Sequence, residues 1–257
     1  LIFVRKELSL LVLTDQQADE MLSRLTSYCK EYSLSVTDTE LRKCIQHLDL
    51  VLETNKTTNL TRILNVEDAA VLHILDSLVL LPYVNKAPDG ALLDMGTGAG
   101  FPGIPLTITT HRKATYIDSV GKKVNAVNEF IGQLGLPNCS ALAIRAEDLA
   151  LKEPSSFDFI TARAVAQSNV IIEYSAPLLK FGGRLVLEKA NLTDEELQNA
   201  NYASQVCGLA RVSRETLELP RDLGHREILI YEKEHESRIK LPRANGMAKN
   251  HPLIPKK

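Results

Sequence analysis

The sequence lacks any apolar run near the roughly 18 residues that a membrane-spanning helix requires. Its apolar N-terminal stretch, residues 1–13, is interrupted by Arg5, Lys6 and Glu7. A secretory signal peptide places its charges first and ends in small residues, and this stretch does neither. We therefore expect a protein without a membrane span or a secretory leader.

Cysteine is scarce and scattered. The four cysteines, Cys29, Cys44, Cys139 and Cys207, are far apart in the sequence, and no histidine stands beside them at the spacing of a metal site. This pattern is typical of reduced thiols in the cytosol rather than of a disulfide framework. We predict a cytoplasmic protein with no metal site.

The net charge is small, at −2, but it is unevenly distributed. Residues 233–257 contain seven lysines and arginines against two acids, a net charge of +5, and the other 232 residues carry 23 basic and 30 acidic side chains, a net charge of −7. A basic end on an acidic body indicates a local anionic partner, although a solvated terminus would have the same composition. We expect residues 233–257 to form a mobile, basic C-terminal tail.

Hydrophobic periodicity predicts a helical N-terminal region over residues 1–85. A first helix is expected at about 15–32, and a second begins at the capping box 37–40, which reads Thr-Asp-Thr-Glu. A third helix is expected at about 66–81, ending before Pro82.

From residue 91 onward, short apolar runs alternate with longer helical ones, which predicts strand–helix–strand units and a parallel sheet. Two closing strands, 209–217 and 226–232, flank a turn and are expected to pair antiparallel at an edge. We therefore predict an α/β, Rossmann-like domain over residues 86–232 with a seven-stranded, mainly parallel sheet. The other strands are expected at 91–95, 114–118, 140–144, 157–162 and 183–188, and the helices at 104–110, 122–136, 170–181 and 194–204.

The strongest chemical signal is a glycine-rich loop that follows a strand and opens a helix. Residues 98–103, Gly-Ala-Gly-Phe-Pro-Gly, match the dinucleotide fingerprint, which places a pyrophosphate on a helix N-terminus. Residues 94–100, Asp-Met-Gly-Thr-Gly-Ala-Gly, match the loop of class I methyltransferases, where the acid faces the methionine end of the cofactor. We favour the second interpretation because Asp94 ends the strand.

Acidic residues also stand at the ends of the next two strands. Asp118 ends the second, where a carboxylate can accept both hydroxyls of a ribose. Glu147 and Asp148 follow the third, where an acid is placed to meet the edge of an adenine. A single acid at a strand end is usually a helix cap. Three in series beside a glycine loop indicate a nucleoside-binding edge.

Several segments together resemble the bacterial RsmG family of small-subunit rRNA guanine-N7 methyltransferases, also called glucose-inhibited division protein B. The resemblance covers about residues 40–253, and its most diagnostic segments are 73–78, His-Ile-Leu-Asp-Ser-Leu, and the glycine loop with its Phe-Pro-Gly ending. Members usually have Arg before the histidine; Leu72 stands there instead, which puts an RNA contact at this position in doubt. The other matching segments are 55–61, 118–123, 145–148, 162–164, 182–184 and 241–253.

The resemblance implies a class I S-adenosylmethionine-dependent methyltransferase fold. It implies methyl transfer from that cofactor to N7 of a guanine in 16S rRNA, with either naked RNA or a small-subunit particle as the partner. Gly98 and Asp118 come from the loop and strand-end arguments, and the other contacts from the family's motifs. The predicted cofactor-binding residues are Gly96, Gly98, Phe101, Asp118, Ala146, Glu147 and Arg163.

Basic residues near the expected cleft and in the tail are the predicted RNA contacts. His73 and Asp76 share a helix face and are expected to form a structural pair that pins the N-terminal helices to the domain; an RNA contact or a place behind the active site is the alternative. We expect a monomer. The predicted RNA contacts are Lys122, Lys123, Arg243 and Lys249.

No catalytic side chain is expected, because guanine N7 carries a free lone pair and no proton, so its attack needs no general base. Exocyclic amine methylation typically uses an Asn/Asp-Pro-Pro-aromatic motif, but residues 161–164 read Thr-Ala-Arg-Ala. The Pro-Cys or Thr-Cys pair of cytosine C5 methyltransferases is absent. Two other classes stay open: a non-enzymatic rRNA-binding or assembly factor with this fold, and an NAD-dependent oxidoreductase, for which we find no substrate domain.

Overall fold

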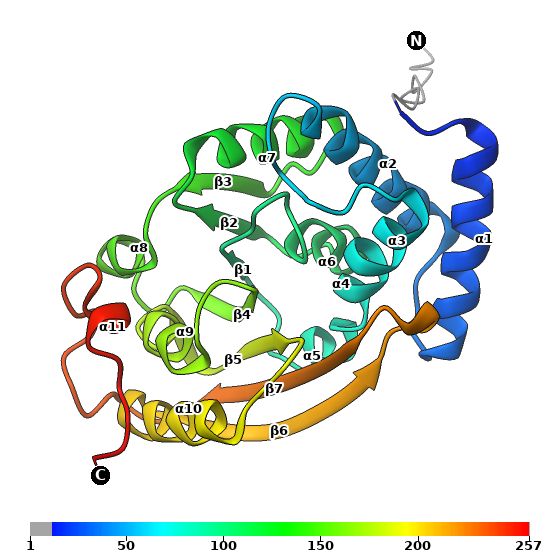
Figure 1. The fold of residues 1–257 in the computed structure, drawn as a ribbon. Coiled ribbons are helices and arrows are strands. Elements are labelled where there is room, and N and C mark those ends of the chain that lie inside the picture. Colours follow the sequence, from blue (N-terminus) through cyan, green and yellow to red (C-terminus); the bar gives the residue numbers. More distant parts are fainter. Residues whose placement is uncertain (1–11, 257) are drawn as a thin grey trace.

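The computed structural model of the chain describes residues 12–256 (Figure 1). Residues 1–11, which include most of the apolar N-terminal stretch, and Lys257 lie outside this range. Seven strands form one sheet in the order β3-β2-β1-β4-β5-β7-β6. The strands are β1 (Leu92–Met95), β2 (Ala114–Asp118), β3 (Cys139–Ala143), β4 (Phe157–Arg163), β5 (Leu179–Lys189), β6 (Leu209–Glu218) and β7 (His225–Lys233).

The pairing of the strands confirms the predicted Rossmann-like architecture. Strands β1 to β5 pair in parallel, and β7 pairs antiparallel with both β5 and β6. Strand β5 is longer than expected, because it begins at Leu179, which pairs with Phe157 of β4. The expected helix at 170–181 therefore ends earlier, as α9 (Ser168–Ser175).

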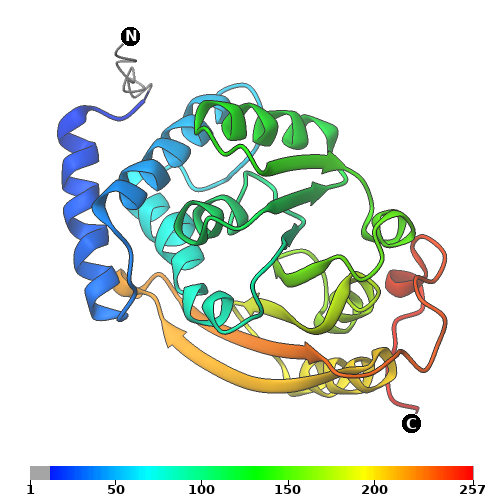
Figure 2. The same ribbon diagram turned by 180° about the vertical axis from the view of Figure 1, so that it is seen from behind.

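Helices cover both faces of the sheet (Figure 2). One face packs against α6 (Gly103–Thr110) and α7 (Gly121–Gln133), and the other against α8 (Ala146–Lys152), α9 and α10 (Asp194–Cys207). Helix α8 is a short, seven-residue element that the strand and helix alternation did not predict. Among the described residues, no helix is both long and apolar enough to cross a membrane.

The N-terminal helices join the α6 and α7 side of the sheet in one apolar core. Helices α1 (Asp15–Glu31) and α2 (Asp38–Asn55) both begin at capping boxes, with Thr14 and Thr37 as the caps. Leu25 of α1 and Leu48 of α2 are fully buried in the same cluster as Phe130 of α7. The helical region is therefore continuous with the core that supports the sheet.

The third expected helix, 66–81, is wrong in detail. It is divided into α3 (Val66–Ala69), the π-helical turn η1 (Ala70–Leu75) and α4 (Asp76–Leu78). Pro82 does not stop a helix, because it lies in the first turn of α5 (Leu81–Asn85), where its missing N–H is not needed. Single π turns widen a helix locally and are frequent at functional sites, and this one contains His73.

The expected mobile tail is also wrong for the described residues. Residues 234–256 lie beside α8 and α9 in both views and contain α11 (Met247–Asn250) (Figures 1 and 2). The Arg238 amide donates to the Val206 carbonyl at 2.8 Å, and the Asn169 side chain donates to the Leu253 carbonyl at 3.0 Å. Backbone hydrogen bonds and apolar contacts, which composition does not reveal, hold this segment on the domain.

Candidate functional site

The predicted cofactor-binding residues lie at one edge of the sheet. They follow the carboxyl ends of β1, β2, β3 and β4, which are neighbours in the order β3-β2-β1-β4. The chain order reverses between β1 and β4, and open α/β sheets bind ligands outside the strand ends at such a switch point. The structure thus gathers residues 94–103, 118, 146–147 and 163 at the edge where a ligand is expected.

Asp94 is fully buried at the end of β1 and organises the glycine loop. Its Oδ2 accepts hydrogen bonds from Thr97 Oγ1 at 2.7 Å and from the Gly103 amide at 3.0 Å. A Cβ at Gly103 would lie 2.6 Å from that oxygen, so only glycine lets α6 begin so close to the carboxylate. The other oxygen, Oδ1, has no partner, and burial raises the pKa of Asp94 to about 6.

Gly98 lies at the open part of the loop. Its φ of +59° is left-handed, and a Cβ there would have no neighbouring atom closer than 4.0 Å. Its amide donates to Asp118 Oδ2 at 3.2 Å, while Asp118 Oδ1 accepts from the Val120 amide at 2.9 Å. A hydrogen bond therefore joins the ends of β1 and β2 in a cradle, in which Gly98 faces open space beside the Asp118 carboxylate. At Gly96, a Cβ would lie 2.4 Å from Val165, so the segment after β4 closes against the loop.

Phe101 does not face this open space. Its side chain is 5% exposed and lies between two histidines of the helical region, with ring centroids 4.6 Å from His73 and 4.3 Å from His47. His47 Nε2 also contacts the Ala99 carbonyl at 2.9 Å. Burial lowers the pKa of both imidazoles to about 3, so both rings are neutral near pH 7. We call His47, Phe101 and His73 the aromatic clamp.

The segment before α3 completes the clamp. Asn55 Oδ1 accepts from the amides of Leu60 at 2.7 Å and Thr61 at 3.0 Å, which fixes the turn after α2. Thr61 Oγ1 then lies 2.9 Å from His73 Nε2. Segment 55–61, one of those that resemble the family, therefore holds His73, which in turn packs against Phe101 of the glycine loop.

Ala146 and Glu147 begin α8, beyond β3, and Glu147 is in contact with the tail. Glu147 is 6% exposed, and its Oε1 accepts from the Gly246 amide at 3.0 Å. Asn245 Nδ2 donates to Asp148 Oδ1 at 2.9 Å. The tail therefore supports the segment in which we predict adenine contacts.

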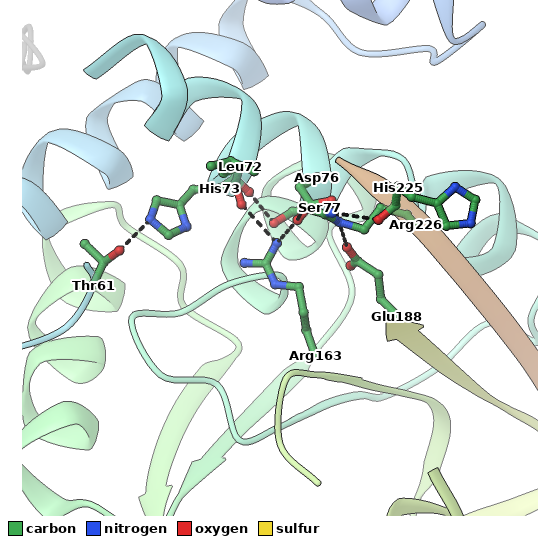
Figure 3. A network of polar contacts seen from close by, with 9 residues as sticks. All are labelled: Thr61, Leu72, His73, Asp76, Ser77, Arg163, Glu188, His225 and Arg226. Atoms are coloured by element: carbon green, nitrogen blue, oxygen red, sulfur yellow. Dashed lines mark hydrogen bonds and ion pairs between the residues drawn. The ribbon is translucent and has the colours of Figure 1, made fainter. Parts of the chain in front are cut away.

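Arg163 ends β4 and belongs to a buried ion cluster (Figure 3). It donates to Asp76 Oδ2 at 2.9 Å and to the Leu72 carbonyl at 3.3 Å. Arg226 of β7 donates to Asp76 Oδ1 at 2.7 Å and to Glu188 Oε1 at 3.1 Å. We call Asp76, Arg163, Glu188 and Arg226 the ion cluster.

The expected pairing of His73 with Asp76 is not observed. His73 points to Thr61, whereas Asp76 points to the two arginines (Figure 3). Each residue separately joins the helical region to the sheet, so both bear the structural role in a different geometry. His73 lies within the π turn η1, and Asp76 directly follows it.

A hollow of about 310 Å³ adjoins the ion cluster at the ends of β4 and β5. Ile63, Leu72 and Ala164 give it apolar walls, and Arg163 and Glu188 are among its polar walls. We call it the strand-end pocket. Arg163 connects it to the glycine loop, because its charge also acts on the Asp94 carboxyl.

The predicted RNA contacts occupy different surroundings. Lys122 is exposed at the start of α7, and Lys123 lines a hollow of about 450 Å³ together with Arg62. Arg243 is bound to the buried Glu173, with 2.6 Å between Nε and Oε1, whereas Lys249 is exposed. Arg243 thus already has an intramolecular partner, and Lys249 is free of one in the described structure.

Three site residues were missed by sequence reasoning: His47, Glu188 and Arg226. Glu188 stands near the end of β5, so the strand-end rule that selected Asp118 would have selected it too. His47 carries no motif, and Arg226 reaches Asp76 across 150 residues, so neither had a local signal. Over residues 12–256, no group of three or more His, Cys, Asp or Glu is placed to hold a metal ion.

Comparisons with known proteins identify the family. A family model described as rRNA small subunit methyltransferase G matches residues 40–224. A "Ribosomal RNA small subunit methyltransferase G" of Alkaliphilus metalliredigens is 35% identical over 88% of this chain and 95% of its own length. The protein of the same name from Staphylococcus aureus strain Newman is 34% identical over 90% of this chain and 98% of its own length.

Solved structures identify the same fold. A geranyl diphosphate methyltransferase in complex with SAM matches with a TM-score of 0.53 and 10% identity, over 66% of this chain and 91% of that chain. At this identity the match shows the class I methyltransferase fold, while the sequence matches show the family. The chain belongs to the rRNA small subunit methyltransferase G family.

Proposed function

We propose that this protein transfers a methyl group from S-adenosylmethionine to N7 of a guanine in 16S rRNA. As a family member, the chain is an rRNA methyltransferase that uses S-adenosylmethionine. The guanine and its N7 atom come from the resemblance and from the chemistry of the site. The observation that carries the proposal is the buried Asp94 at the switch point, with the open glycine cradle beside it.

The residues at this edge fit the cofactor. Asp94 Oδ1 is a buried oxygen without a partner, and it offers negative potential to a ligand that carries sulfonium and ammonium charges. Gly98 leaves room for the ligand, and the Asp118 carboxylate beside it can accept ribose hydroxyls. We expect Glu147 and Ala146 at the adenine and Arg163 at the carboxylate of the methionine end, where a guanidinium fork pairs well.

S-adenosylmethionine supplies an electrophilic methyl group. The task of the protein is to hold the acceptor base in line with that group, which can supply most of the rate. Positive charge moves from the sulfonium onto the guanine during transfer, so negative potential beside the acceptor base would favour that movement. The two histidines of the aromatic clamp stay neutral near pH 7, so neither is expected to add a titration to the rate profile.

The acceptor RNA is expected to meet exposed basic residues around this edge. Lys122 and Lys123 begin α7 near the cradle, and Lys249 lies on the tail segment that contacts the start of α8. We propose these as phosphate contacts, on either naked 16S rRNA or a small-subunit particle, and place the protein in the cytoplasm as a monomer.

Methyl transfer to two matched RNA fragments tests the proposal. Fragments of 16S rRNA that contain the target site are prepared with guanine or with 7-deazaguanine, which lacks only the acceptor nitrogen. Incubation with methyl-labelled S-adenosylmethionine should label the first and leave the second unlabelled. Label in both would exclude N7 as the acceptor. Cofactor binding without label in either RNA, including intact particles, would favour the assembly-factor alternative.

A further inference from the structure

The strand-end pocket carries a polar group that the cofactor site does not use. Glu188 lines it from β5 and is 2% exposed. Its Oε1 accepts from Arg226 at 3.1 Å, but its Oε2 is buried without any partner. Figure 3 shows this carboxyl reaching from the end of β5 toward the arginine and Asp76.

The other carboxyl of the ion cluster has no comparable vacancy. Asp76 accepts from Arg163 and Arg226 through Oδ2, and from Arg226 again through Oδ1. Glu188 is therefore the carboxyl in this pocket with a spare acceptor. A buried acceptor without a donor is unfavourable, and such an atom in a native protein calls for an explanation, of which a ligand donor is one.

The vacant Oε2, together with the second lone pair of Oε1, matches one edge of guanine. Guanine presents N1–H and the N2 amino group side by side, and two adjacent donors suit the two oxygens of a carboxylate. Adenine and cytosine do not offer this adjacent pair, because their ring nitrogen at the equivalent position is an acceptor. The apolar walls formed by Ile63, Leu72 and Ala164 suit the faces of a base.

We propose that the strand-end pocket receives the base of the target guanine and that Glu188 selects it by accepting N1–H and N2–H. This inference rests on the proposed function. N7 lies on the opposite side of the purine from that edge, so a base held by Glu188 directs N7 away from β5. Enzymes that modify a base in a folded nucleic acid commonly turn it out of its stack into such a pocket.

The electrostatics of the pocket disfavour an ionised Glu188 until a base supplies donors. Burial and the neighbouring Asp76 raise the pKa of Glu188, while Arg163 and Arg226 act in the opposite direction. Two N–H donors would favour the ionised carboxylate, and the pocket without a base lacks them. Arg226 holds both Glu188 and Asp76, so it is a positioning residue for the base contact.

Inosine at the target position gives the most direct test, because it lacks only the N2 amino group and keeps N1–H, O6 and N7. We measure single-turnover methyl transfer by the full chain to the two RNA fragments at saturating RNA. The wild type should methylate the guanine fragment about tenfold faster, which is the effect of one hydrogen bond to a charged group. The Glu188→Gln variant should lose most of this preference, because an amide cannot accept both donors.

Glu232→Gln is the matched control. Glu232 is also an ion-paired acid of the sheet, bound to Arg184 at 3.0 Å, but it does not line the pocket. This variant should keep the wild-type ratio of guanine to inosine rates. Binding of S-adenosylmethionine by each variant shows that it is folded.

The outcomes separate this inference from the proposed function. Equal wild-type rates on guanine and inosine would overturn the pocket assignment and leave methyl transfer intact. A Glu188→Gln variant that slows both reactions equally would make Glu188 a structural member of the ion cluster and would also overturn it. Transfer to neither fragment, or to 7-deazaguanine, would overturn the proposed function and this inference with it.

Discussion

The two halves of the site differ in how the chain builds them. The glycine-loop half is local: Asp94 and Gly103 are nine residues apart and share one hydrogen bond. The strand-end half is assembled across the chain, because Asp76 meets Arg163 across 87 residues and Arg226 across 150. A ligand loop can therefore be encoded in a short motif, while the pocket beside it depends on the completed fold.

The largest effect is expected in the long-range half. Asp76→Ala would leave two guanidiniums in a buried cluster without their shared carboxylate, since the Asp76 side chain is 3% exposed. Breaking such a buried pair from one side costs about 3–5 kcal/mol of unfolding free energy. Urea denaturation measures this loss. Asp19→Ala, which breaks an exposed pair with Arg42, is the control and should change stability little.

In the glycine-loop half, removing the charge of Asp94 should stabilise the fold, whereas removing Asp76 destabilises it. The pKa of Asp94 rises from 3.8 to about 6 on folding, so the unfolded chain binds fewer protons between these values and stability falls as pH rises through them. Asp94→Asn removes that charge. We expect the variant to gain up to about 3 kcal/mol over the wild type at pH 7, and no gain at pH 3, in denaturation at several pH values.

The same substitution should weaken cofactor binding, since the cofactor is cationic where the carboxylate lies. A variant that is both more stable and a poorer binder would show that the local half trades stability for function. If Asp94→Asn lowered stability at pH 7 as much as at pH 3, the buried charge of Asp94 would not be what destabilises the fold.

Asp118 offers a smaller, purely local effect. Asp118→Ala removes the proposed ribose contact and the acceptor of the Gly98 amide, so cofactor affinity should fall by about 1–3 kcal/mol. Calorimetric titration with S-adenosylmethionine measures it, and Asp89→Ala, on an exposed turn, is the control. An unchanged dissociation constant would remove Asp118 from the site.

Single substitutions in the tail should give the smallest effects, and these effects should be on RNA affinity. Lys249→Ala removes an exposed charge, so RNA affinity should fall modestly and its dependence on salt should become shallower by about one counterion. Arg243→Ala should instead loosen the tail, because Arg243 is bound to Glu173. Binding of 16S rRNA fragments at several salt concentrations decides between the two roles. Equal slopes for Lys249→Ala and wild type would place the RNA surface elsewhere.

Deletion of residues 238–257 would not be a clean version of that experiment. The Gly246 amide binds Glu147, so the deletion also removes support from the predicted adenine segment. Composition had indicated a mobile tail, which has no contacts of this kind to lose. The contacts make weaker cofactor binding the expected result, and single charge substitutions are the sharper probe.

The features that the sequence predicted are the local ones, and the features that it missed depend on long-range contacts. The strands, the glycine loop and the acids at strand ends depend on short periodicities and motifs, and those elements were located within a few residues. The π turn at 70–75, the packed tail and the ion cluster depend on tertiary contacts. His47 illustrates the limit, since its neighbours Ala99 and Phe101 are about fifty residues away and nothing near it in sequence marks it.

The most direct test of the central assignment is calorimetric titration of Gly98→Val with S-adenosylmethionine. A Cβ at Gly98 would enter open space with no atom closer than 4.0 Å, which is where we propose the cofactor lies. Gly182→Val is the matched control, because Gly182 also has positive φ and empty surroundings but belongs to β5 at its opposite end. We expect Gly98→Val to lose binding and Gly182→Val to keep it; wild-type affinity in Gly98→Val would contradict the assignment.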